Sequence, residues 1–345
     1  MTPTPTPDSS HATALSTQAE DMLQRFRAGD LRALGRLLTL VENQHAQAGA
    51  ALTRLYPSAG QAYRVGLTGA PGAGKSTLVS RIAGAWAAAG RSVAVLAMDP
   101  TSPFTGGALL GDRIRFQSPQ AEGGAKPVFF RSAASRGHTG GLAKTTEEMS
   151  VVLEAFGYER LLIESVGVGQ VGLDIAEACD TTVVIVVPES GDDIQALKAG
   201  LLEIADILVV NKCDRPGARA LMTQLHEALH YRTHAQKGAW QVEVLLTCGH
   251  TGEGLEELGA QIERHRAHLL EHVGSERIRR ERLRRALLNL VREELRVAAA
   301  EAFAAGRLPD GRALEPLLDQ VLGGQSDPFA VARDTVRRLF AQGDT

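Results

Sequence analysis

The chain has 345 residues, of which 44% are hydrophobic and 22% are charged, and its formal net charge is −3. This composition is typical of a globular protein of about two domains, and so small a charge gives no general attraction to nucleic acid or anionic lipid. Its three scattered cysteines do not make a disulfide framework, and no apolar run reaches the ~20 residues of a membrane helix. We therefore expect a cytoplasmic protein with no nucleic-acid or membrane partner.

The N-terminal region has two parts. Residues 1–14 contain Pro, Thr and Ser but no basic segment followed by an apolar one, so they predict a disordered tail rather than a secretory signal. Residues 15–60 carry apolar side chains at helical spacing, with a break at Gly29-Asp30. We interpret them as an N-terminal helical extension that packs as a scaffold.

Residues 61–272 alternate strand-like and helix-like segments. Strands are predicted at 64–68, 92–98, 127–131, 160–164, 181–187, 206–210 and 242–247. Several are continuously apolar, as at 182–187, which is typical of parallel strands covered on both faces. The pattern predicts a doubly wound α/β domain with a mostly parallel sheet and a ligand at the carboxyl ends of its strands.

Residues 273–345 are predicted to form a C-terminal helical arm. A long helix runs to about residue 305, where Gly306 and Pro309 end it, and further helices are expected at 313–322 and 328–341. We interpret the arginines at the start of the arm as a solvated helix face. They are Arg277, Arg279, Arg280, Arg282, Arg284 and Arg285.

A phosphate-binding loop is predicted between the first strand and the helix after it, because Gly69–Ser76 fits G-x-x-x-x-G-K-[ST]. Its glycines let the backbone approach a phosphate chain, and the amides at a helix N-terminus favour an anion. Lys75 is placed to reach the β- and γ-phosphates, and Ser76 to hold Mg²⁺. The predicted phosphate-binding residues are Gly69, Ala70, Pro71, Gly72, Ala73, Gly74, Lys75, Ser76 and Thr77.

A guanine-binding motif is predicted at Asn211–Asp214, which reads N-K-x-D directly after strand 206–210. Asp214 can accept N1–H and the exocyclic amine of guanine, a donor pair that adenine lacks. Lys212 can lie along the base, and Asn211 can tie this loop to the phosphate loop. The loop after the last strand is expected to offer backbone amides to guanine O6 from Cys248, Gly249 and His250.

Three carboxylates occupy strand ends or loops near the phosphate loop. Asp99 follows strand 92–98, Asp112 lies in Gly111–Arg113, and Glu164 ends strand 160–164. Carboxylates there can hold Mg²⁺ through its waters or orient an attacking water; the alternative for each is a cap of a helix or turn. We predict Ser76, Asp99, Asp112 and Glu164 as metal residues. The predicted catalytic residues are Lys75, Asp112 and Glu164.

These segments together resemble the MeaB/ArgK family of G proteins, which includes the methylmalonic aciduria type A proteins, over about residues 30–340. The signature-like segments are 69–77, 98–107, 110–113, 135–141, 163–170 and 191–195. The resemblance implies a P-loop G domain of the signal-recognition-particle and MinD-like class, with a C-terminal arm for homodimerisation. By the same resemblance, Asp192, Gln195 and Lys198 form a switch.

The resemblance also implies a function. Family members hydrolyse GTP to GDP and phosphate with Mg²⁺, gate adenosylcobalamin loading into a cobalamin-dependent acyl-CoA mutase such as methylmalonyl-CoA mutase, and protect that mutase. Three departures leave the partner mutase open. Val171-Gly172 stand where the family usually has Ser-Glu, Cys248-Gly249 stand in place of Ser-Ala, and Arg113 stands where Lys is common.

Three alternative functions remain. One is a kinase of amino-acid transport proteins, and another is a structural partner that binds GTP but hydrolyses it too slowly to matter. The third is a metal-insertion GTPase, which would need a cluster of His or Cys ligands. We interpret the histidines at helical spacing as surface residues instead; they are His226, His230, His265, His268 and His272.

Overall fold

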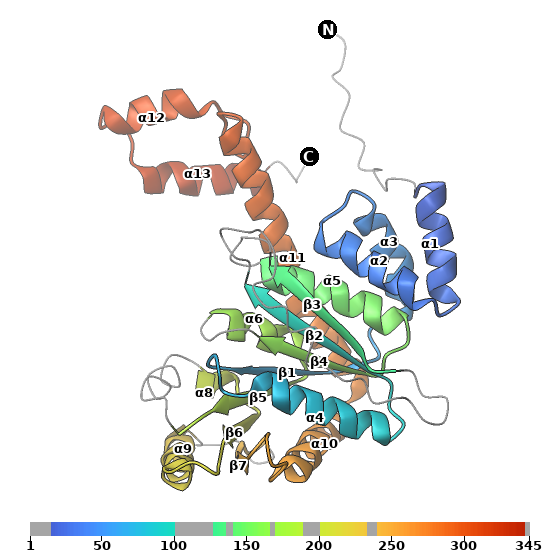
Figure 1. Cartoon of the computed structure of the whole chain (residues 1–345). Helices are drawn as coiled ribbons and strands as arrows, with labels where there is room; N and C mark the ends of the chain where they lie inside the picture. The colour runs from blue at the N-terminus through green and yellow to red at the C-terminus, as the bar shows by residue number, and fades with distance from the viewer. Residues whose placement is uncertain are drawn as a thin grey trace. The chain divides into compact units, whose positions relative to one another are not determined.

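The computed structural model describes residues 15–100, 127–135, 141–165, 170–188, 201–232 and 240–341 (Figure 1). The chain divides into two compact units, Met1–Ala286 and Leu287–Thr345. The expected tail at 1–14 and the predicted site residues Asp112, Asp192, Gln195 and Lys198 lie outside the described residues.

The first unit is built on a seven-stranded sheet in the order β3-β2-β4-β1-β5-β6-β7. Its strands are β1 (Tyr63–Gly69), β2 (Val93–Pro100), β3 (Phe129–Ser135), β4 (Arg160–Ser165), β5 (Thr181–Val186), β6 (Ile207–Asn211) and β7 (Glu243–Thr247). Each of the six strand pairings is parallel. The predicted doubly wound α/β fold is therefore confirmed.

Helices cover both faces of this sheet (Figure 1). Val65, Leu67 and Val183 face α4 (Lys75–Ala88) and α10 (Leu255–His272), and pack in one apolar cluster with residues of those two helices. The alternate strand positions face α5 (Gly141–Ala155), α6 (Gln170–Ala178) and α9 (Ala218–Arg232), beside the short α8 (Leu202–Ile204). Burial on both faces explains why these strands are continuously apolar.

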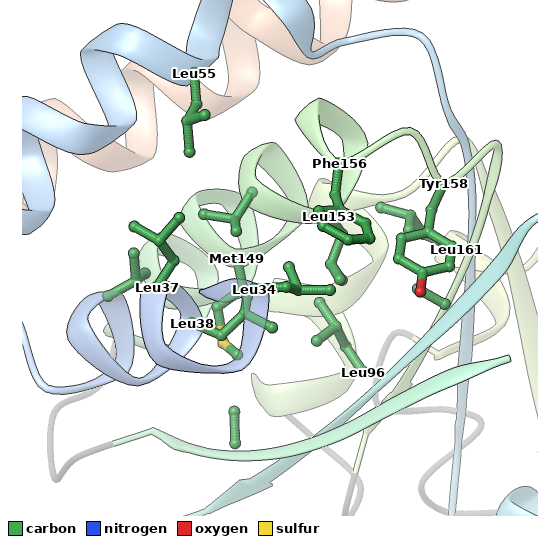
Figure 2. Packing of buried hydrophobic residues seen from close by; sticks show 14 of the residues in the cluster. Leu34, Leu37, Leu38, Leu55, Leu96, Met149, Leu153, Phe156, Tyr158 and Leu161 are labelled. Carbon is green, nitrogen blue, oxygen red and sulfur yellow. The ribbon is translucent and has the colours of Figure 1, made fainter. Parts of the chain in front are cut away.

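The N-terminal extension consists of α1 (Thr17–Arg27), α2 (Leu31–Glu42), α3 (Ala48–Leu55) and a short 3₁₀ helix, η1 (Tyr56–Ser58). Figure 2 shows Leu34, Leu37 and Leu38 of α2 beside Met149 and Leu153 of α5, and all five side chains are buried. The extension thus adds its apolar stripe to the core through α5. Replacing one such buried leucine with alanine typically lowers the free energy of unfolding by about 2–5 kcal/mol.

Most predicted strand ends differ from the structure by one to four residues, and one turn was not predicted. The extension has a second break after α2, where Gln44 takes a φ of +49°, although neither Gly nor Pro marks the turn. The largest difference in a strand is at β3, which spans Phe129–Ser135 instead of the predicted 127–131.

A buried ionic cluster ties several segments together at the amino ends of the strands. The Arg64 side chain on β1 is 1% exposed, and its guanidinium donates to Glu147 and Glu154 of α5, at 2.6 Å from Nε to Glu154 Oε1. Asp180, before β5, accepts the backbone N–H of Arg64 at 2.9 Å and an N–H of Arg282 at 3.0 Å. Each buried charge in the cluster thus has an opposite partner, as burial requires.

Arg282 corrects part of the interpretation of the arginine-rich segment. Its side chain is buried in the first half of α11 (Ser275–Ala304) and also donates to the carbonyl oxygens of Gly60 and Ala62, each at 3.0 Å. This arginine is therefore a structural anchor and no part of a solvated face. Arg277, Arg279, Arg280 and Arg284 are exposed, as the interpretation expected.

The histidine interpretation was wrong for His265. This residue is buried on α10, where its Nδ1 lies 2.7 Å from Thr181 Oγ1 and the ring of Trp240 packs on it. Tyr63 contacts the same Thr181 hydroxyl. Burial lowers the pKa of His265 to about 4, so the imidazole is neutral at pH 7 and belongs to the core.

The second unit contains the rest of α11, then α12 (Leu314–Leu322) and α13 (Pro328–Ala341). Arg312 organises the turn before α12, because its guanidinium donates to Asp310, to Asp334 and to Thr335 at 2.7–2.9 Å. Leu308 is the one hydrophobic residue that is buried among the described residues of this unit. No helix in the described parts of either unit has the length and apolar character of a membrane span.

Replacing Arg64 with leucine is expected to lower the free energy of unfolding by about 3–5 kcal/mol, because it removes the buried guanidinium that pairs with both Glu147 and Glu154. The matched control is Arg25→Leu, which removes a largely exposed pair with Asp30 and should cost about 1 kcal/mol or less. Urea unfolding of both variants measures the difference. Equal losses would show that the buried cluster does not stabilise the unit.

Candidate nucleotide-binding site

The predicted site residues that the structure describes meet at the carboxyl edge of the sheet. Strand β1 ends at Gly69 and leads through a loop into α4, which begins at Lys75. Asn211 ends β6 and lies in register with Thr247, the last residue of β7. Because all these strands are parallel, their loops lie side by side at one edge, where ligands of such sheets bind.

The phosphate loop depends on two glycines. Gly69 has a φ of +150°, and a Cβ there would lie 2.1 Å from the carbonyl oxygen of Ile185 on β5. Gly74 has a φ of +90° as the N-cap of α4, and a Cβ there would lie 2.3 Å from Asn211 Nδ2. Only glycine fits either position without a shift of the backbone.

Lys75 lies within this loop. Its side chain is buried, and Nζ donates to the carbonyl oxygens of Gly69 and Ala70 at 2.8 and 3.0 Å. The ammonium group and the N-terminal amides of α4 therefore lie together at the end of β1. This arrangement gives the loop a positive potential that suits a phosphate group.

Ser76 and Glu164 form a pair of oxygen ligands beside the loop. The Ser76 hydroxyl donates to Glu164 Oε1 at 2.6 Å, and Glu164 is buried near the end of β4. A hydroxyl and a carboxylate next to a phosphate loop suit Mg²⁺, which prefers oxygen ligands. Asp99 lies in β2, where it pairs in register with Ala134, but its side chain is not among those described, and Asp112 lies outside the described residues.

Asn211 joins three segments through one buried side chain. Its Nδ2 donates to the carbonyl oxygen of Ala73 in the phosphate loop at 2.7 Å. Its Oδ1 accepts from the Thr247 hydroxyl and from the backbone N–H of Gly249, both at 3.1 Å. The side chain is 2% exposed, so the loops after β1, β6 and β7 have a fixed relation to one another.

The two loops of the guanine motif also contact each other. Lys212 has a φ of +58°, which turns the backbone sharply after β6 and leaves Asp214 exposed. The Cys248 thiol donates to Asp214 Oδ1 at 3.2 Å. This bond and the Asp214 backbone N–H hold the pKa of the Asp214 carboxyl below its usual value, so the group is ionised at neutral pH.

Gly249 and His250 belong to the same edge. Gly249 packs against Thr77 of α4, which a Cβ at position 249 would approach to 3.1 Å. The carbonyl oxygen of His250 accepts an N–H of Arg81 at 3.3 Å. These contacts connect the loop after β7 to the first turns of α4.

Two side chains of this edge were not predicted from the sequence. Cys248 was expected to contribute only its backbone, and no role was expected for the Thr247 hydroxyl. The signal for Thr247 was its place at the end of a predicted strand beside Asn211. No sequence pattern could reveal the Cys248–Asp214 contact, because it depends on how two loops approach each other.

The described residues contain no group of three or more His, Cys, Asp or Glu side chains that could hold a metal ion as a cluster. His268 and His272 stack on each other on α10, and His272 Nδ1 lies 3.0 Å from the His268 carbonyl oxygen. The ligand set that the metal-insertion alternative requires is therefore not found in the described part of the chain.

A parallel sheet with a glycine-rich phosphate loop between β1 and α4 defines a P-loop nucleotide-binding fold. The model of the family described as "Methylmalonyl Co-A mutase-associated GTPase MeaB" matches residues 34–304. The chain belongs to this family of GTPases, as the sequence resemblance predicted.

Several proteins are similar to this chain. A Pyrococcus horikoshii protein named as a GTPase is 41% identical over 94% of this chain and 99% of its own length. The GTPase ArgK of Escherichia coli is 35% identical over 70% of this chain and 74% of its own. The mitochondrial methylmalonic aciduria type A homolog of Mus musculus is 32% identical, over 72% and 64%.

Among solved structures, the crystal structure of an LAO/AO transport system kinase is similar. It is 24% identical, the match covers 96% of this chain and 100% of that one, and the TM-score is 0.68. At this identity the likeness supports the fold alone.

Replacing Asn211 with alanine is expected to lower the free energy of unfolding by about 2–3 kcal/mol, because it leaves the Ala73 carbonyl, the Thr247 hydroxyl and the Gly249 N–H without their partner. Asn43→Ala, at an exposed position after α2, is the control and should change stability by about 0.5 kcal/mol or less. Chemical denaturation of the two variants makes the comparison. A loss for Asn211→Ala no larger than that of the control would contradict the role of Asn211 as a tie.

Proposed function

We propose that this chain hydrolyses GTP and uses the nucleotide to control a cobalamin-dependent acyl-CoA mutase. In this proposal it gates adenosylcobalamin loading and protects the mutase, which is methylmalonyl-CoA mutase or a relative. The observation that carries the guanine assignment is the Asn211 side chain, which joins an N-K-x-D loop to a phosphate loop. The name of the matching family supports the choice of mutase.

The nucleotide would lie across the carboxyl edge of the sheet. The Gly69–Thr77 loop would surround the phosphates, with Lys75 reaching the β- and γ-phosphates. Asp214 would accept the two donors of guanine, and Lys212 would lie along the base. The backbone amides at Cys248, Gly249 and His250 would face O6.

Ser76, Asp99, Asp112 and Glu164 would hold Mg²⁺. When bound, Mg²⁺ neutralises charge on the phosphates. The proposed catalytic residues are Lys75, which stabilises negative charge on the transferred phosphate, and Asp112 and Glu164, which position water or the metal. The hydrogen bond from the Ser76 hydroxyl to buried Glu164 supports a defined orientation of both side chains.

Asp192, Gln195 and Lys198 are proposed as a switch that reports the nucleotide state to the mutase. A nucleotide can change the affinity for a partner only if it binds two conformations with different affinity. By reciprocity, the mutase must then change the affinity for GTP or GDP by the same factor. The coupling can therefore be measured as a change in mutase affinity caused by the nucleotide, or as a change in nucleotide affinity caused by the mutase.

The three alternative functions predict different activities or require different residues. A kinase would transfer phosphate to an acceptor protein instead of water. The similar LAO/AO transport system kinase shares the fold, but its sequence identity is too low to assign that activity to this chain. A metal-insertion GTPase needs a ligand cluster that the described residues do not contain. A structural GTP binder would bind guanine nucleotides without turnover.

The unmodified chain is expected to bind GTP in preference to ATP, and Asp214→Asn should reverse the order of GTP and XTP, because xanthine presents a carbonyl at C2 to the amide donor. With the host's cobalamin-dependent mutase present, GTP affinity and turnover should both change. Competition binding and single-turnover hydrolysis measure these effects, with and without the mutase.

Lys75→Ala serves as the control with impaired hydrolysis. Its single-turnover rate of GTP hydrolysis is expected to fall by a factor on the order of 10²–10³. Mutase reconstitution with adenosylcobalamin in GTP, GDP and a non-hydrolysable analogue tests the chaperone step. If no mutase changes nucleotide binding and no nucleotide changes cofactor loading, the proposal fails. Phosphate transfer to a protein acceptor would then favour the kinase.

We also propose that the chain forms a homodimer through its second unit. This unit has a single buried hydrophobic residue among those described, whereas ten large hydrophobic side chains are exposed by 43% or more. They are Leu287, Leu288, Val291, Leu295, Phe303, Leu318, Leu322, Phe329, Val336 and Phe340. So large an apolar surface is typical of an interface, and a two-fold interface needs one self-complementary patch.

Replacing Phe329 and Phe340 of α13 with serine is expected to shift the chain from dimer to monomer in light scattering. Both side chains are at least 70% exposed, so the substitutions remove little packing within the unit. Tyr56→Ser, at an exposed position in the first unit, is the control. A dimer that survives the double substitution would place the interface elsewhere.

A further inference from the structure

A cavity lies at the edge of the sheet opposite the phosphate loop. It has a volume of about 100 Å³ and is lined by the starts of β1 and β4, the last turns of α10 and the first turns of α11. All of its lining residues belong to the first unit. Its charged lining residues are Arg160, Arg266, Arg279, Arg282 and Asp180. Four arginines against one carboxylate indicate an anionic ligand.

Arg282 and Asp180 neutralise each other. Nη1 of Arg282 contacts both carboxylate oxygens of Asp180, at 3.0 and 3.3 Å. The same guanidinium also donates to two backbone carbonyl oxygens before β1. The positive charge that a ligand would meet in the cavity therefore comes from the other three arginines.

Arg160 is buried in the cavity wall with part of its guanidinium unsatisfied. The residue is 4% exposed and begins β4 in register with Tyr63 of β1. Its Nη2 donates to Glu263 at 3.3 Å, whereas its Nε has no hydrogen-bond partner in the described part of the chain. Burial lowers the pKa of this guanidinium. A buried donor without a partner is destabilising, and an anion that reaches it removes that penalty.

Arg266 brings a second guanidinium to the same place. Its Cζ lies 5.7 Å from the centroid of the Tyr63 ring, and Cζ of Arg160 lies 5.5 Å from the same centroid. The two cations also share one carboxylate, because Nη1 of Arg266 lies 3.5 Å from Glu263. Like charges so placed repel each other, and an anion beside them offsets the repulsion.

Helix α11 adds positive groups from a third direction. The guanidinium of Arg279 lies against Gly60, where a Cβ would be 3.2 Å from its Nη2. Ser275, which also lines the cavity, is the first residue of α11. The first amides of a helix have no partner within it and carry a partial positive charge. Residues of β4, α10 and α11 thus all favour an anion in this cavity.

The chemistry of the wall suits a phosphate group. Guanidinium groups bind phosphate oxygens through paired N–H donors. Phosphate carries about −1.5 to −2 charges at pH 7, so it matches several cations better than a carboxylate does. A cavity of about 150 Å³ holds benzene, so one of about 100 Å³ suits a group of roughly five heavy atoms, the size of phosphate. Leu269, Leu270 and Ile278 form an apolar wall beside the arginines.

We propose that this cavity binds the phosphate group of a small molecule through Arg160, Arg266 and Arg279. The site is separate from the phosphate loop, because it lies at the opposite edge of the sheet, and its chemistry requires no part of the proposed function. The bound group joins β4, α10 and α11. Its source is either inorganic phosphate or a phosphate monoester whose carbon part contacts the apolar wall.

Equilibrium dialysis of labelled inorganic phosphate against the full chain tests the site, with Mg²⁺ and excess GDP present to occupy the phosphate loop. Arg266→Gln combined with Arg279→Gln should weaken phosphate binding at least about tenfold, because charge-assisted hydrogen bonds are lost. The matched control is Arg264→Gln combined with Arg280→Gln. It removes one exposed arginine from each of the same two helices outside the cavity and should change the affinity less than about twofold.

Phenyl phosphate, used to displace the labelled phosphate, distinguishes the two sources. Tighter binding of phenyl phosphate than of inorganic phosphate supports a monoester, and equal or weaker binding supports inorganic phosphate. Thermal unfolding of each variant checks that the chain is folded. If the double variant does not fold, Arg279→Gln alone carries the test, since this side chain is exposed, and it should weaken phosphate binding at least about threefold.

The site is overturned if labelled phosphate does not bind in the presence of GDP, or if the cavity variant loses no more affinity than the matched control. The guanine assignment is judged separately. Failure of GDP to bind the unmodified chain would remove that assignment. The difference between the two pairs of arginine substitutions would still stand, since both variants have the same phosphate loop.

Discussion

The parallel direction of all seven strands is the constraint on which the first unit depends. It brings the end of β4 and the loops after β1, β6 and β7 to one edge of the sheet, so residues far apart in the chain meet there. It also brings the strand beginnings together at the opposite edge, where Arg64, Asp180 and Arg282 are buried. One edge is thus free to hold a ligand while the other holds the layers together.

At the ligand edge, Asn211 makes the phosphate loop and the base loop a single structure. Because one side chain bonds to Ala73 and to Gly249, a displacement of either loop disturbs the other. The close approach of Gly74 to Asn211 has the same consequence, since any side chain at position 74 would clash with the side-chain amide of Asn211. The two ends of a nucleotide are therefore expected to bind cooperatively, a property that neither motif has alone.

The sequence predicted most of the fold and the identity of the candidate site, for reasons that particular residues make clear. Continuous apolar segments such as 182–187 require burial on both faces, and this places them in a parallel sheet. The phosphate loop and Asn211–Asp214 are local patterns tied to strand ends, so their position followed from the strands.

What could not be predicted depends on contacts between distant segments. Arg282 belongs to an arginine-rich segment that looks solvated, and only the approach of Asp180 makes it a buried anchor. His265 has the spacing of a surface histidine, yet Trp240 and Thr181 cover it. Cys248 meets Asp214 across two loops. Composition and spacing contain no information about such contacts between distant residues.

The buried ionic cluster limits where a nucleotide-dependent change can occur. Helix α5 contributes both Glu147 and Glu154 to Arg64, and separating these charges in the core would cost several kcal/mol. A nucleotide's differential affinity for two conformations is commonly worth only about 1–3 kcal/mol. The switch proposed above should therefore leave α5 and β1 in place and act through backbone beyond the carboxyl ends of the strands.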